Sequence, residues 1–65
     1  MTREEAQAKA REIGKHMMDS IRESNAAYAL ETGEPSTVTE EDYLKGEREI
    51  AQAAMNYWKK RGTIE

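Results

Sequence analysis

Only one side chain in this chain has the character of a general acid or base at neutral pH. His16 is the single histidine, and no nucleophile or second base stands at a spacing that would make it catalytic. The chain has no cysteine, so disulfides and thiolate metal sites are excluded. We therefore expect neither an enzyme nor a bound cofactor.

A run of carboxylates, Glu40–Asp42, is the next candidate for chemistry. Clustered carboxylates bind hard cations, but the alternating oxygen ligands and fixed glycine of a calcium loop are absent here. Acidic residues also favour the first turn of a helix, where they oppose the positive end of the helix dipole. The run predicts the start of a helix, with no metal site.

Three cations, Lys59, Lys60 and Arg61, stand beside Tyr57 and Trp58. Cations interleaved with aromatic rings suit single-stranded nucleic acid, but cations are also favoured at the end of a helix. The net charge of the chain is −3, whereas a nucleic-acid binder normally presents a broad basic surface. Nucleic-acid binding through these three cations is the alternative prediction.

The first element expected to position these groups is a helix over about residues 3–31. Small or apolar residues recur every three or four positions, as on one face of a helix: Ala6, Ala10, Ile13, Met17, Ile21, Ser24 and Tyr28. Thr2 and Glu5 have the spacing of a capping box. Short polar side chains near Ser24-Asn25 compete with the helix backbone, so a break there, giving three helices, is the alternative.

A second helix is expected over about residues 40–61, after a loop at 32–39. Gly33 and Pro35 end the first helix, and Thr39 with Asp42 forms a second capping box. Gly62 suits the C-terminal end. Apolar and small residues form one broad face, with one glutamate among them: Tyr43, Leu44, Glu47, Ile50, Ala51, Ala54, Tyr57 and Trp58.

The fold predicted for residues 1–65 is a single small all-α domain, an antiparallel two-helix hairpin. A short connection favours antiparallel neighbours. Folding about Pro35 would place Tyr28 against Tyr43, Ile21 against Ile50 and Met17 against Ala54. In the same register, Ile13 lies beside Trp58 and Gly14 lies opposite Tyr57.

The core of such a hairpin is thin, because Leu, Ile, Val and Phe together make only 7 of 65 residues. Small domains without disulfides or metals commonly gain stability by association, so we predict a homodimer that completes a four-helix bundle. The residues expected in the hairpin core or the dimer interface are Ile13, Met17, Ile21, Tyr28, Tyr43, Leu44, Ile50, Ala54, Tyr57 and Trp58. Met18 and Leu30 are candidates for a second interface.

The predicted function is a non-enzymatic protein–protein interaction module, such as a regulator or inhibitor of a larger protein. Residues 31–49 carry seven acids and two bases, while residues 50–65 carry three bases and one acid. This polarity favours an antiparallel homodimer and an acidic end that meets a basic partner surface. No apolar run approaches the ~20 residues of a membrane span, and residues 1–12 lack the apolar segment of a secretory signal. A cytoplasmic location is the default expectation.

Overall fold

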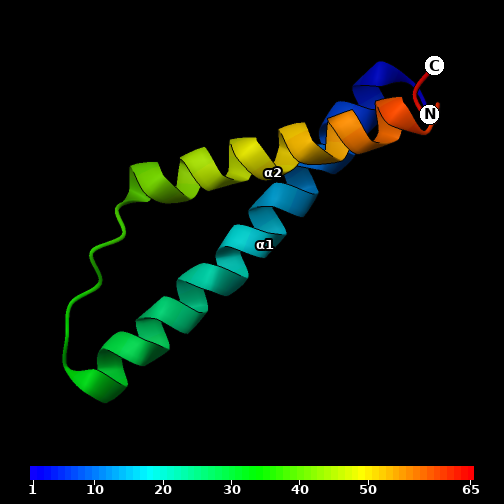
Figure 1. Cartoon of the computed structure of the whole chain (residues 1–65). Coiled ribbons are helices and arrows are strands. Elements are labelled where there is room, and N and C mark those ends of the chain that lie inside the picture. Colours follow the sequence, from blue (N-terminus) through cyan, green and yellow to red (C-terminus); the bar gives the residue numbers. More distant parts are fainter.

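The computed structural model describes all 65 residues and contains two helices, α1 (Arg3–Thr32) and α2 (Glu40–Lys60). The helices pack against each other and no strand is present, so the predicted all-helical hairpin is confirmed. Helix α1 is continuous through Ser24 and Asn25. The loop spans the gap between the helices at one end of the molecule, and both chain termini lie together at the other (Figure 1).

The helix boundaries follow from capping groups close in sequence. The Thr2 hydroxyl accepts a hydrogen bond from the Glu5 amide, and the Glu5 carboxylate accepts one from the Thr2 amide. Thr39 and Asp42 form the same reciprocal pair at the start of α2. Gly33 ends α1 with φ of 72°, in the left-handed region that glycine adopts without steric cost. Both predicted capping boxes are confirmed.

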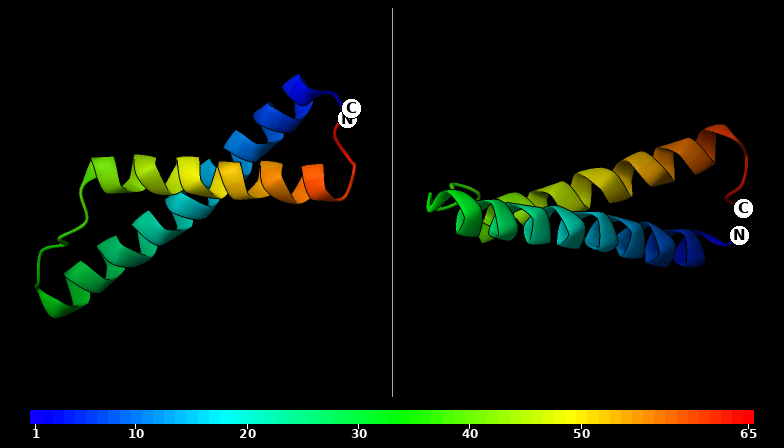
Figure 2. Two further views of the ribbon diagram at one scale, coloured as in Figure 1. Left: turned by 45° about the horizontal axis from the view of Figure 1, so that its top comes forward. Right: turned by 90° about the horizontal axis from the view of Figure 1, so that it is seen from below.

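The two helices meet along ridges in which every fourth residue takes part. The contact ridge of α1 consists of Ala6, Ala10, Gly14 and Met18, all buried, and that of α2 consists of Tyr43, Glu47, Ala51 and Met55, buried or half-buried. Ridges of this type interlock when helices cross at about 50°. The two helices are inclined to each other and do not run parallel, and from below they appear as two layers (Figures 1 and 2).

The predicted register is wrong by several residues. Gly14 lies against the backbone of Glu47, where a Cβ on Gly14 would be 2.5 Å from the carbonyl oxygen, and Met18 lies against Gly46. Tyr57 is therefore not the neighbour of Gly14. The two helices approach each other most closely along the ridge of small side chains on α1, because small side chains let the two backbones come near each other. The larger Ile13 and Met17 therefore lie on the flank of this ridge.

The core is correspondingly small. Only six residues are buried, and no large side chain is fully buried. A cluster of Ala6, Ala10 and Met55 lies near the termini, with Trp58 and Ile64 packed against it. Two hydrogen bonds tie the last residues of the chain to Met1: its amino group donates to the Thr63 carbonyl and its carbonyl accepts from the Glu65 amide.

Candidate interaction surfaces

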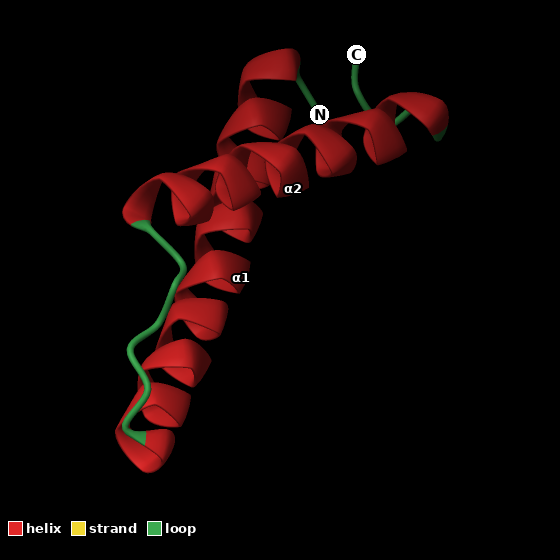
Figure 3. Cartoon of the chain, turned by 60° about the vertical axis from the view of Figure 1, so that its left-hand side comes forward, coloured by secondary structure: helices red, strands yellow, loops and turns green.

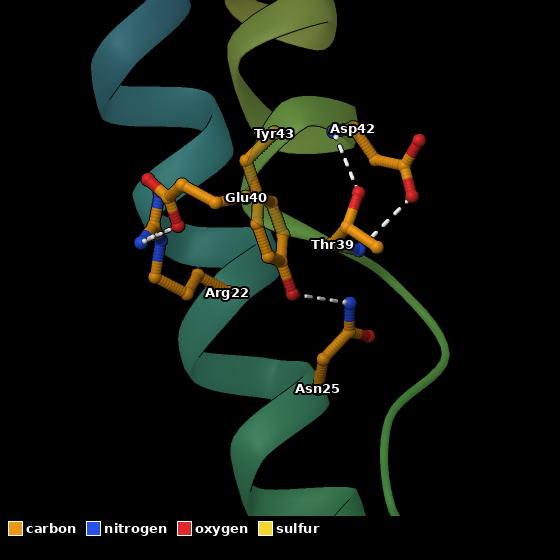
Figure 4. Close-up of polar contacts among 6 residues, drawn as sticks. All are labelled: Arg22, Asn25, Thr39, Glu40, Asp42 and Tyr43. Atoms are coloured by element: carbon orange, nitrogen blue, oxygen red, sulfur yellow. Dashed lines mark hydrogen bonds and ion pairs between the residues drawn. The ribbon is translucent and has the colours of Figure 1, made fainter.

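A polar cluster joins the two helices near the loop. The Arg22 guanidinium donates to both carboxylate oxygens of Glu40 at 2.7 and 2.9 Å, and it lies 4.5 Å from the centre of the Tyr43 ring. The Asn25 amide donates to the Tyr43 hydroxyl at 3.1 Å (Figure 4). The hydrogen bonds to Glu40 raise the pKa of Arg22. This cluster orders the start of α2 over α1, so its groups serve the fold.

The hairpin has two distinct sides, set by the residues that flank the contact ridges. Successive residues of a helix lie about 100° apart, so the residues that follow each ridge residue line one side of the hairpin. Gln7, Arg11, Arg48 and Gln52 follow ridge residues on the two helices, and all four line the same cleft. The residues that precede the ridge residues must therefore share the opposite side.

That opposite side is apolar at its centre. We call it the apolar side, and it consists of Ile13, Met17 and Ile21 on α1 and Gly46, Ile50 and Ala54 on α2. Ile13, Met17 and Ile21 are 39%, 48% and 44% exposed, whereas the three residues of α2 are half-buried. These apolar side chains flank the hairpin contact without being covered by it.

The remaining predicted interaction residues are scattered over the molecule. Tyr43 is buried in the polar cluster, and Trp58 is half-buried against the core cluster of Ala6, Ala10 and Met55. Leu44 is exposed on the ridge of Arg48 and Gln52, away from the apolar side. Tyr28 and the loop residues 34–38 line a small hollow. Figure 3 shows the loop running from the end of α1 to the start of α2.

The two candidates for a second interface have different outcomes. The prediction that Met18 belongs to a second interface is wrong, because Met18 is buried in the hairpin contact against Gly46. Leu30 is almost fully exposed near the end of α1. The sequence pattern could not separate Met17 from its neighbour, since both face the same half of the helix and the choice depends on where the second helix crosses.

The three cations at the end of α2 do not all line the same surface. Lys59 lines the cleft, whereas Lys60 and Arg61 do not. The Arg61 guanidinium donates to the Tyr57 hydroxyl at 2.9 Å and lies 5.5 Å from the centre of its ring. The Tyr57 ring is thus engaged within its own helix end.

The cleft lies between the first half of α1 and residues 47–59 of α2. It has a volume of about 510 Å³, and its lining residues are Arg3, Gln7, Ala10, Arg11, Glu47, Arg48, Ala51, Gln52, Met55 and Lys59. Four cations and one carboxylate give it a net charge of +3. This cleft was not predictable from the sequence, because its cations come from four separate places in the chain.

No set of His, Asp or Glu side chains converges in a way that would hold a metal ion. Neither helix combines the length and apolar character needed to cross a membrane. Comparison of the chain with protein-family models, with curated proteins and with solved structures finds no match.

Proposed function

We propose that this protein is a non-enzymatic protein–protein interaction module that acts as a homodimer, with the apolar side as the dimer interface. The exposure of Ile13, Met17 and Ile21 along one ridge of α1 carries the proposal. These are three of the larger apolar side chains of a chain that has few, and the hairpin leaves each of them about half in water. A second copy of the same surface would cover them.

The exposed area of the hairpin supports a second copy as the occupant. The chain exposes 5205 Å², whereas a compact protein of its mass exposes about 4,200 Å². The difference of about 1,000 Å² is close to the ~800 Å² that each partner contributes to a standard interface. The hairpin measures 49 × 17 × 16 Å, so a second rod laid alongside would produce a more compact bundle.

Symmetry and charge suggest how the two copies would pair. In an antiparallel dimer with twofold symmetry, Met17 at the middle of the ridge meets Met17 of the second copy, and Ile13 meets Ile21. The same arrangement brings the acidic loop end of each copy beside the other's termini, where Lys60 and Arg61 are exposed.

Sedimentation across a concentration series tests this function. Wild-type protein should show a monomer–dimer equilibrium, and Met17→Glu should raise the dimer Kd by at least about tenfold, because each copy would bury an unpaired carboxylate. Leu44→Glu is the matched control, since Leu44 has similar exposure on the other side of the hairpin. A wild-type monomer at every concentration would reject the proposal.

The alternative of nucleic-acid binding gains no specific support from the placement of Lys59, Lys60 and Arg61. Lys59 lines the cleft whereas Lys60 and Arg61 do not, and the exposed Tyr57 ring beside them interacts with Arg61. Regulation or inhibition of a larger protein remains part of the proposal, with the basic cleft between α1 and α2 as the second binding surface.

A further inference from the structure

We infer that the cleft on the side opposite the dimer interface binds an acidic, amphipathic helical segment of a partner protein. This inference rests on the proposed protein-binding function and names the chemistry of its partner. The cleft collects Arg3, Arg11, Arg48 and Lys59 in a chain whose net charge is −3. A cluster of cations in a chain of negative net charge indicates a binding site for an anionic group.

None of the four cations has a partner within the chain. The single ion pair of the structure joins Arg22 to Glu40, outside the cleft, and no side-chain hydrogen bond involves Arg3, Arg11 or Arg48. Glu47 is the one carboxylate of the lining, and it leaves the net charge at +3. Like charges that face each other across a cleft repel, and an anion placed between them removes that repulsion.

The floor of the cleft identifies the ligand as amphipathic. Ala10, Ala51 and Met55 form an apolar base, with Ala10 and Met55 buried, while Gln7 and Gln52 add amide groups at the rim. Because the two alanine side chains are small, they leave room above this base for the side chains of a bound helix. Apolar side chains would rest on the base and carboxylates would meet the arginines, as in recognition of a helix in a groove.

The same lining disfavours nucleic acid as the occupant. No aromatic ring lines the cleft, so bases have nothing to stack on. Four cations, partly offset by Glu47, also make only a short basic footprint. A protein segment uses both the apolar base and the charged rim, whereas a phosphate backbone would use only the rim.

The test is binding measured by fluorescence anisotropy, with a labelled helical peptide built from Glu, Ala and Leu as the probe. Wild-type protein should bind this peptide, and it should bind a version with Gln in place of Glu much more weakly. Arg11→Gln with Arg48→Gln should weaken binding at least about fivefold, because two charge-assisted contacts are lost. Lys9→Gln with Lys45→Gln removes the same charge outside the cleft and should leave binding close to wild type.

Three outcomes would overturn the inference. The first is equal loss in both double variants, which would indicate attraction by net charge alone. The second is tight binding of a single-stranded oligonucleotide that is lost in Arg11→Gln with Arg48→Gln. The third is no binding of the acidic peptide by a protein that sedimentation shows to be dimeric. A monomeric protein that binds the peptide would instead reject the homodimer and leave the cleft assignment intact.

Discussion

Gly14 of α1 sits directly against the backbone of Glu47 in α2, so closely that a Cβ at Gly14 would lie 2.5 Å from the Glu47 carbonyl oxygen. This contact fixes where the helices cross. It also determines which side chains are buried between them, and therefore which are left on the apolar side.

Gly14→Ala should destabilise the hairpin. The substitution favours helix formation by about 1 kcal/mol, but the new methyl group meets rigid backbone and should cost about 1–3 kcal/mol. Gly46→Ala is the matched control, because its Cβ would meet only the flexible end of Met18. Urea denaturation should show Gly14→Ala as the less stable of the two, and the reverse order would contradict the crossing point.

The register shows where sequence reasoning was sufficient and where it was not. Both capping boxes were predictable, because Thr2 with Glu5 and Thr39 with Asp42 interact within one helical turn. The pairing of the helices was not, because periodicity identifies an apolar half of each helix but not the line of closest approach. The line of closest approach follows the small residues of α1, so Met18 is buried while Met17 is half exposed.

The hydrogen bond between Asn25 and Tyr43 should couple α1 to α2 near the loop. A double-mutant cycle with Asn25→Ala and Tyr43→Phe should give a coupling free energy of about 0.5–1.5 kcal/mol. The cycle is needed because Asn25→Ala alone also improves helix propensity. Additive effects in urea denaturation would show that the bond contributes nothing to stability.

The two capping boxes should make the stability of the fold depend on pH in the acidic range. Hydrogen bonds from the Thr39 amide and hydroxyl groups lower the pKa of Asp42 below its ordinary 3.8, and those from the Thr2 hydroxyl and amide lower the pKa of Glu5 below 4.5. A depressed folded-state pKa stabilises the fold above the unfolded value, and that stability is lost as the pH falls through the folded-state value. Helical stability should therefore decline from about pH 4.5 downward.

Thr39→Ala isolates the contribution of the second capping box. It should cost about 1 kcal/mol at neutral pH. It should also remove part of the acid dependence below pH 3.8 that Asp42 supplies, while the Thr39 amide still donates to Asp42. Thr37→Ala serves as the control, because Thr37 makes no side-chain hydrogen bond. Circular dichroism during urea titration at a series of pH values measures both effects. An acid dependence unchanged by Thr39→Ala would contradict the assignment.

The orientation of the proposed dimer should respond to charge reversal at the loop end. Glu34→Lys with Glu41→Lys should weaken an antiparallel dimer at low salt, since the acidic loop end would no longer meet the basic end of the second copy. Added salt should shrink the difference between variant and wild type. Glu40 is left in place because it holds Arg22 within the hairpin. A reversal that strengthens the dimer would indicate parallel packing.

The proposed homodimer is tested most directly by an isotope-filtered NMR experiment on an equal mixture of labelled and unlabelled protein. Intermolecular NOEs should connect the Met17 methyl group to Met17 of the other copy and the Ile13 methyls to Ile21, while the Leu44 methyls, on the opposite side, should show none. Intermolecular NOEs at Leu44 without any at Met17, or none at all at high concentration, would contradict the apolar side as a homodimer interface.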